Sequence, residues 1–244
     1  MLFDENLKIE QTFETLRIEG ETIEDICPLK FAADQKKEML YLSHGHHFQI
    51  IKIDKNFNFV KKTLFKPNHQ YNFIRGLCFD NKNNHVYASD YNSRKIEIFT
   101  NDLNYLKSIS LGGYVPMDLK VNDSMICAKV LDIANMDLIF LKFYSLKTGI
   151  LEQTYQMELY RFKDQLISCY DSNFYEFDHK SKQLLCYKNS NDPNKVLIEK
   201  IVVADLNNDI TPFNGYFICF SDCLIMLCEQ LELNIIKLKL LKLS

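Results

Sequence analysis

The chain has 244 residues, of which 47% are hydrophobic and 25% are charged, and its formal net charge is −3. These values are typical of a folded globular chain and exclude long disordered regions. Lys, Asp, Glu or Asn interrupts every apolar run before the ~18 residues that a membrane-spanning helix needs, so we expect no membrane association.

The N-terminal segment is the acidic part of the chain. The first 25 residues carry eight Asp or Glu residues against Lys8 and Arg17, a net charge of −6, whereas residues 30–120 carry a net charge of +6. The acidic start at Asp4 and Glu5 differs from a secretory signal, which is basic and then apolar. We therefore expect a cytoplasmic protein.

Apolar and polar residues alternate with a period of two along most of the chain, which predicts short β-strands. The clearest segments are residues 39–43, 85–89 and 165–170, each bounded by Asp, Asn or Lys clusters. Sustained helical stripes with capping residues are lacking in the sequence. The sequence thus predicts an all-β protein.

Two consecutive segments repeat one strand plan at an offset of 46 residues. Residues 34–64 match residues 80–110 without a gap at seven positions: Asp34/Asp80, Lys36/Lys82, Tyr41/Tyr87, Ser43/Ser89, Ile50/Ile96, Asn58/Asn104 and Lys61/Lys107. About one or two matches would arise by chance. Self-similarity of this kind indicates a repeat architecture.

The repeated plan consists of four strands, predicted in the second unit at residues 77–80, 85–89, 95–99 and 105–110. It recurs more loosely along the rest of the chain. The strands predicted there are 125–129 and 138–144 (second and third of the third unit), 166–170 (second of the fourth), and 216–220, 224–228 and 235–241 (second to fourth of the fifth).

Four strands every 40 to 50 residues are the signature of propeller blades, whose sheets stack to bury both faces. We therefore predict one domain over residues 1–244, a β-propeller of five to six four-stranded blades. The predicted blades are residues 25–72, 73–114, 115–157, 158–208 and 209–244, and residues 1–24 supply a strand that closes the last blade.

One segment of the second unit carries a family resemblance. Val86-Tyr87-Ala88-Ser89 precedes Asp90, and an Asn-containing turn then leads to Lys95-Ile96-Glu97-Ile98-Phe99. This resembles the core of an NHL repeat, as found in tripartite-motif/NHL proteins. Asn92 lies one position early, Lys95 replaces the family's Arg, and the other units keep little beyond the hydrophobic pattern.

The resemblance implies a scaffold or recognition surface. Some NHL proteins read single-stranded RNA and others bind proteins, and related six-bladed propellers include peptidylglycine lyase and gluconolactonase-like enzymes. Because a fold does not select a function, all three classes stay open at this point.

Antiparallel blades place the loops between second and third strands, and between successive blades, on one face, which we call the loop face. Its candidate binding residues are His44, His46, His47, Lys66, His69, Tyr71, Arg75, Tyr91, Asn92, Arg94 and Tyr114. We expect this face to bind a protein partner. The alternative is single-stranded RNA, since aromatic rings interleaved with cations suit stacked bases and phosphates.

Metal-dependent or other enzymatic chemistry is the third hypothesis, and the sequence favours it least. The His44-Gly45-His46-His47 cluster would need a further ligand from another blade, which the spacing does not supply, so we interpret it as a polar turn. Asp118 is the only carboxylate predicted on an inner strand, too few for a calcium centre. A nucleophile elbow, a phosphate loop and a dinucleotide fingerprint are all lacking, so we expect no catalysis and no cofactor.

Eight cysteines are spread along the chain, most of them inside strand-like runs. Without an export signal they are expected to be reduced and buried rather than paired in disulfides. Cys219, Cys223 and Cys228 are close in sequence but lack the Cys-x-x-Cys spacing of a zinc knuckle.

Overall fold

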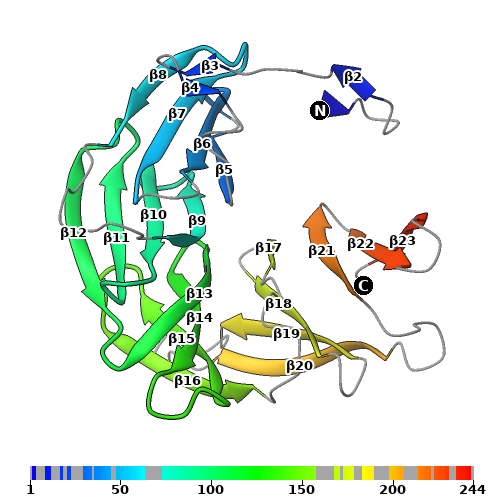
Figure 1. The fold of residues 1–244 in the computed structure, drawn as a ribbon. Coiled ribbons are helices and arrows are strands. Elements are labelled where there is room, and N and C mark those ends of the chain that lie inside the picture. Colours follow the sequence, from blue (N-terminus) through cyan, green and yellow to red (C-terminus); the bar gives the residue numbers. More distant parts are fainter. Residues whose placement is uncertain are drawn as a thin grey trace.

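In the computed structural model, the described residues form 23 strands and no helix (Figure 1). The described residues are 2–3, 9–11, 17–18, 21–22, 30–34, 36–44, 48–63, 73–157, 168–170, 173–178, 183–189, 198–205, 214–220, 223–230 and 235–242. None of them forms a helix long and apolar enough to span a membrane. The prediction of an all-β protein is confirmed.

Four of the described sheets have four antiparallel strands, as the repeat predicted. Sheet I consists of β5 (Phe31–Asp34), β6 (Met39–Ser43), β7 (Ile50–Asp54) and β8 (Phe59–Lys62). Sheet II consists of β9 (Ile74–Asp80), β10 (His85–Asp90), β11 (Lys95–Thr100) and β12 (Tyr105–Ser110). Sheet III consists of β13 (Tyr114–Val121), β14 (Met125–Asp132), β15 (Ile139–Ser145) and β16 (Leu151–Met157). Sheet IV consists of β17 (Ser168–Tyr170), β18 (Asn173–Asp178), β19 (Gln183–Asn189) and β20 (Ile198–Asp205).

The remaining described strands form smaller sheets. Sheet V has three strands, β21 (Asn214–Phe220), β22 (Cys223–Gln230) and β23 (Ile235–Lys242). Near the N-terminus, β1 (Leu2–Phe3) pairs with β2 (Ile9–Gln11), and β3 (Arg17–Ile18) pairs with β4 (Glu21–Thr22). Among the described residues, no strand from the N-terminal segment pairs with sheet V.

The sheets pack face to face along an arc, as propeller blades do (Figure 1). One hydrophobic cluster fills each of the three interfaces from sheet I to sheet IV. The clusters include Ile50 and Val86 between sheets I and II, Ile98 and Ile126 between sheets II and III, and Phe143 and Phe174 between sheets III and IV. The first strands β5, β9, β13, β17 and β21 contact one another in sequence along the inside of the arc. Both faces of sheets II and III are therefore covered, and their central strands, β10, β11, β14 and β15, are buried at nearly every position.

The predicted order of strands is wrong in the fourth and fifth units. Residues 166–170 were expected to be a second strand, but β17, at Ser168–Tyr170, is the first strand of its sheet and β18 is the second. Residues 216–220 were also expected to be a second strand, but they belong to β21, which contacts the inner strand β17. The alternation of apolar and polar residues identifies a strand, whereas the place of that strand in its sheet depends on the neighbouring strands and sheets.

Gly76 lets two inner strands approach closely. A Cβ atom at Gly76 would lie 2.5 Å from both the Cβ and the backbone nitrogen of Leu119, on β13 of the next sheet. A backbone atom cannot move aside as a flexible side chain can, so this contact between sheets II and III requires glycine.

Candidate binding surface

The acidic residues that repeat between sheets I and II cap turns. Asp34 Oδ1 accepts hydrogen bonds from the backbone nitrogens of Lys36 and Lys37, both at 3.1 Å, and Asp80 Oδ1 accepts the equivalent bonds from Lys82 and Asn83. Asn122 Oδ1 does the same in sheet III, with Ser124 and Met125 as donors. These side chains hold the turn between the first two strands of each sheet, which accounts for their repetition without any catalytic role.

The repeated serines fix the loop-face ends of the inner strands. Ser89 Oγ accepts a hydrogen bond from Gly76 N at 2.7 Å, and Ser43 Oγ accepts one from Lys30 N at 2.9 Å. In sheet II this contact stabilises a bulge, because the pairing passes from Leu77 opposite Ala88 to Ile74 opposite Asp90. The bulge gives β9 one residue more than the facing part of β10, which changes the direction of the chain beside Arg75.

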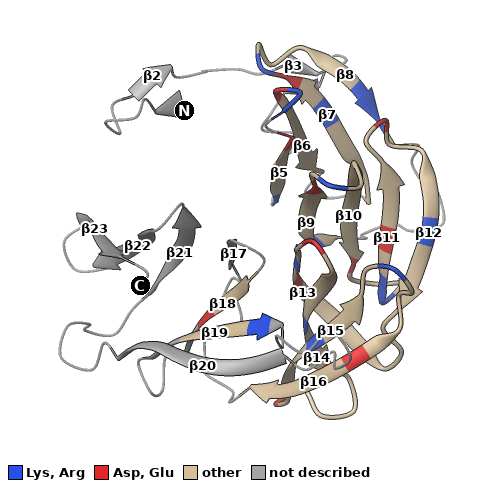
Figure 2. Cartoon of the chain, turned by 180° about the vertical axis from the view of Figure 1, so that it is seen from behind, with Lys and Arg blue, Asp and Glu red and all other residues tan. Residues whose placement is uncertain are grey.

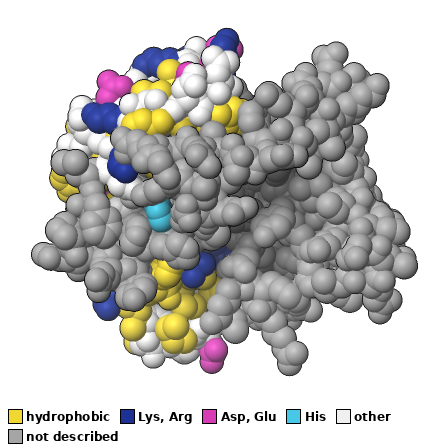
Figure 3. All heavy atoms as spheres, turned by 45° about the horizontal axis from the view of Figure 1, so that its top comes forward, with side chains coloured by type: hydrophobic (Ala, Val, Ile, Leu, Met, Phe, Trp, Pro, Cys, Tyr) yellow, Lys and Arg dark blue, Asp and Glu magenta, His cyan; other side chains and the backbone are white. Residues whose placement is uncertain are grey.

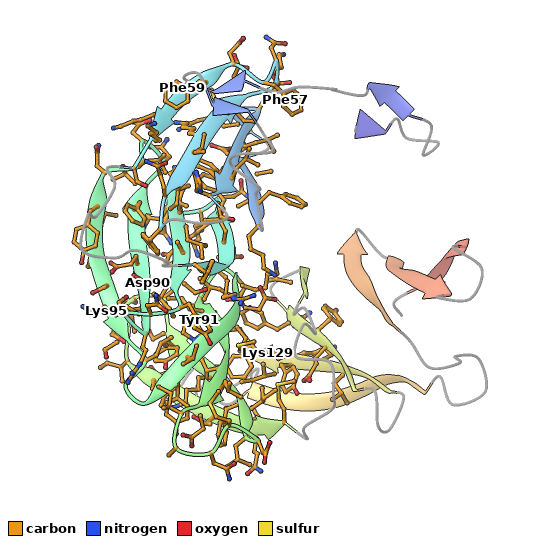
Figure 4. All side chains as sticks on the ribbon, in the orientation of Figure 1. Phe57, Phe59, Asp90, Tyr91, Lys95 and Lys129 are labelled. Atoms are coloured by element: carbon orange, nitrogen blue, oxygen red, sulfur yellow. The ribbon has the colours of Figure 1, made fainter. Side chains whose placement is uncertain are left out.

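The NHL-like segment is also explained by turn geometry. Asp90 Oδ1 accepts hydrogen bonds from the backbone nitrogens of Asn92 at 3.1 Å and Ser93 at 3.0 Å, and Arg94 adopts a positive φ of 56°. Lys95 pairs across the ladder with Asp90, and Figure 4 shows both near Tyr91 at the junction of β10 and β11. Asp90 is 1% exposed, so it organises the turn and is not presented to a ligand.

Arg75 and Tyr91, two of the predicted site residues, come together with Phe73. The Arg75 guanidinium carbon lies 5.7 Å from the centre of the Phe73 ring and 5.4 Å from that of Tyr91. Tyr91 N donates a hydrogen bond to Phe73 O at 3.1 Å, which ties the β10–β11 turn to the start of β9. Two aromatic rings thus position one cation at the loop-face end of an inner strand.

Three loop-face turns are joined by backbone hydrogen bonds. Leu111 N donates to Arg94 O at 2.8 Å, and Ile133 N donates to Gly113 O at 3.1 Å. The joined turns are residues 91–94, 111–113 and 133–138, which we call the turn cluster. Within it Ile133 is 37% exposed and Met136 is 49% exposed.

Phe73, Ile133 and Met136 were not among the predicted binding residues. For Ile133 and Met136 the available signal was an apolar residue in an otherwise polar loop, between Asp132 and Asp137. For Phe73 the sequence held no such signal, because its role depends on the position of Tyr91, eighteen residues later along the chain.

Tyr114 and His44 do not join the Arg75 group. Lys142 Nζ lies 3.3 Å from the centre of the Tyr114 ring, and Phe140 packs against that ring edge-on at 5.7 Å between centroids. Burial lowers the pKa of Lys142. His44 is 5% exposed and its backbone nitrogen donates to Gln49 O at 2.9 Å, so its ring is part of the packed end of sheet I.

The other candidates are divided between exposed positions and undescribed ones. Asn92 and Arg94 are exposed in the turn cluster. His46, His47, Lys66, His69 and Tyr71 lie outside the described residues. In the part of the chain that the structure describes, no three His, Cys, Asp or Glu side chains group so as to hold a metal ion.

A second group of polar residues is buried between sheets III and IV. Tyr187 donates a hydrogen bond to Glu176 Oε2 at 2.7 Å, and Lys129, 1% exposed, pairs across the ladder with Asp118. Figure 4 places Lys129 nearer the inside of the arc than Lys95. Burial, followed by the charge of Glu176, raises the pKa of the Cys127 thiol well above its usual value. A thiol in this environment stays protonated and is a poor nucleophile.

The comparisons with known proteins concern the fold. No family model matches the chain, and no curated protein matches its sequence. Among 794 matching chains of solved structures is Kuenenia stuttgartiensis hydrazine synthase, with a TM-score of 0.62 and 11% identity. The match covers 88% of this chain and 64% of that chain. At this identity the likeness shows a shared fold and says nothing of activity.

Proposed function

We propose that the chain is a non-catalytic, NHL-like β-propeller of five or six blades that binds a protein partner through its loop face. The packing of sheets I to IV along one arc supports the architecture, as does the structural likeness described above. The NHL resemblance of residues 86–99 supports the family.

The position of β21 supports a proposal for where the ring would close. Since β21 follows β17 along the inside of the arc, the open position of sheet V is the outer edge, beyond β23. In our proposal a strand from residues 1–24 pairs with β23 at that edge and forms hydrogen bonds with its backbone groups.

The observation that carries the binding function is the exposure of Ile133 and Met136 within the turn cluster. Backbone hydrogen bonds hold these turns in place before any partner arrives, which lowers the entropic cost of binding. Met, Tyr and Arg are enriched at the centres of protein interfaces, and Met136, Tyr91 and Arg94 lie in these turns.

Several contacts favour a protein over single-stranded RNA. Cations already cover one face of the Tyr91 and Tyr114 rings, which reduces the aromatic surface available to bases. Figure 2 shows Lys and Arg interspersed with Asp and Glu over the described strands and turns, without one continuous basic stripe. Figure 3 shows apolar side chains beside basic ones on the face it presents.

The test compares two double variants as bait in a pull-down from cells that express the protein. Ile133→Ser/Met136→Ser removes apolar surface from the turn cluster, whereas Tyr105→Ser/Leu106→Ser removes exposed apolar surface from the outer strand β12. The proposal expects one set of captured proteins to be lost with the first variant, retained with the second, and insensitive to ribonuclease.

Either of two results would overturn the proposal. One is equal capture by both variants, which would place the binding surface elsewhere. The other is release of the captured material by ribonuclease together with salt-dependent binding of RNA, which would assign the loop face to nucleic acid.

A further inference from the structure

Arg75 is held in place by its surroundings on the loop face. The bulge capped by Ser89 sets the backbone of β9, and the rings of Phe73 and Tyr91 lie 5.7 and 5.4 Å from the guanidinium carbon. An arginine fixed in this way loses little conformational entropy when it binds a ligand.

Among the described residues, the Arg75 Nε is buried and has no acceptor, whereas Arg75 as a whole is only half-buried. The ion pairs found among the described residues join Lys52 to Asp102 and Lys55 to Glu38, and Arg75 takes part in neither. A ligand from solvent would meet the terminal Nη groups, because the Nε is buried. A positioned guanidinium is a ready partner for an oxyanion, which these two groups can bind with two parallel hydrogen bonds.

The surroundings of Arg75 combine positive charge with apolar surface. Arg94 is exposed in the adjoining turn, and Lys95 follows it at the start of β11. The turn cluster then leads by backbone hydrogen bonds to the exposed side chains of Ile133 and Met136. A matching ligand would carry negative charge next to apolar groups.

We propose that Arg75 is a recognition residue that binds the carboxylate of an acidic residue on the partner protein, with apolar residues of the same segment packing on Ile133 and Met136. This inference rests on the proposed function and names the chemistry of the partner. A carboxylate fits better than a nucleic-acid backbone, because Arg75 is a single fixed cation beside apolar side chains, whereas a strand of phosphates needs a row of cations.

The test uses three labelled probes of about ten units each, a size that suits an extended segment lying over a loop face. The first is a peptide of alternating Leu and Glu, the second has Gln in place of each Glu, and the third is oligouridine. Binding to the full chain is followed by fluorescence anisotropy at moderate salt. We expect the Glu peptide to bind and the Gln peptide to bind at least about tenfold more weakly, as for the loss of a charged hydrogen-bonded pair.

Substitutions at Arg75 assign this preference to one side chain. Arg75→Gln should weaken binding of the Glu peptide by about tenfold or more, and Arg75→Lys should recover part of it because the charge remains without the planar fork. Lys107→Gln is the matched control, since it removes one exposed positive charge from the outer strand β12 and should leave binding unchanged. Thermal unfolding of each variant shows whether it is folded.

The inference is overturned if neither peptide binds, if the two peptides bind equally well, or if Arg75→Gln binds the Glu peptide as tightly as the parent does. Preferential binding of oligouridine that depends on Arg75 would assign a phosphate ligand and overturn it too. Failure of the proposed function is distinguishable in the pull-down. If Ile133→Ser/Met136→Ser loses the captured proteins while Arg75→Gln retains them, the partner-binding face stands and the role of Arg75 falls.

Discussion

Two cations that lie over aromatic rings, Lys52 and Arg75, differ in what surrounds their donors. Lys52 Nζ lies 5.8 Å from the centre of the Tyr41 ring, and it donates to Asn101 O at 2.9 Å and Asp102 Oδ1 at 3.0 Å. Arg75 lies over Phe73 and Tyr91, but its Nε meets no acceptor in the described part of the chain. Similar cation–aromatic contacts therefore serve different purposes, according to whether the remaining donors of the cation are satisfied.

The Lys52 contact joins two sheets. Lys52 and Tyr41 belong to sheet I, whereas Asn101 and Asp102 form the turn between β11 and β12 of sheet II. Tyr41 OH also donates to Asn101 O at 3.0 Å, and the hydrogen bond from Lys52, followed by its charge, lowers the pKa of Asp102. We interpret this group as a structural link, in contrast to Arg75, whose Nε has no acceptor among the described residues.

The largest expected effect comes from Gly76→Ala, which would break the bulge beside Arg75 and leave the Lys52 link in place. The added methyl group would meet the backbone of Leu119 at 2.5 Å, so the free energy of unfolding should fall by about 3 kcal/mol. Urea denaturation measures this change. Gly113→Ala is the control, because no atom lies within 4 Å of its added Cβ, and a comparable loss there would contradict the argument.

An intermediate effect is expected from removing the two cations in turn. Lys52→Met loses charged hydrogen bonds across the interface of sheets I and II and should cost about 1.5 kcal/mol of stability. Arg75→Met keeps the contact with the two rings and should cost less than about 0.5 kcal/mol, within the range of ordinary surface changes. Thermal unfolding of both variants at one pH makes the comparison, and an equal loss for the two would remove the distinction between a structural and a binding cation.

The smallest expected effect is a pH dependence at the Lys52 link. Because the hydrogen bond and charge of Lys52 lower the pKa of Asp102 in the folded chain, the ionised carboxylate contributes stability above its unfolded pKa of about 3.9. That contribution is lost as the pH falls through the lower folded value. The difference in Tm between the parent and Asp102→Asn should therefore shrink below about pH 4.

The size of this pH effect is limited by solvent. The Asp102 side chain is 66% exposed, so solvent screens its interaction with Lys52. Asp137→Asn, an exposed change on the loop face, is the control. A Tm difference between the parent and Asp102→Asn that grew on acidification would show that the sign of the argument is wrong.

Three of the four strands of the second unit were predicted to within one residue, whereas the first strand and the candidate site were predicted in part. Strand β9 begins at Ile74, three residues before the predicted start at Leu77. The predicted strands at 85–89, 95–99 and 105–110 match β10, β11 and β12 to within one residue, because both faces of sheet II are covered and the local pattern is unambiguous. Arg75 and Tyr91 were selected for their residue types and predicted loops. Phe73 was missed because its contact with Tyr91 spans two strands.

Later parts of the chain show where sequence patterns stop being sufficient. The segment 166–170 was correctly expected to contain a strand and wrongly placed as the second of its sheet. His44 was selected as a surface residue, but the structure buries it at the end of sheet I, in the position that Asp90 holds in sheet II. In both cases the outcome depends on neighbouring segments that the local pattern does not encode.

The sequence by itself determined that this protein is all-β and built from four-stranded repeats, since alternation and the offset of 46 residues reflect local backbone geometry repeated along the chain. The tertiary structure alone decided which of the two cations over aromatic rings, Lys52 or Arg75, has acceptors for its donors among the described residues. Asp34, Asp80 and Asp90 bind backbone amides within a few residues, whereas the positions of Lys52 and Arg75 depend on segments brought together by packing. Hydrogen bonds of short range follow from sequence, but the satisfaction of a buried donor depends on the whole fold.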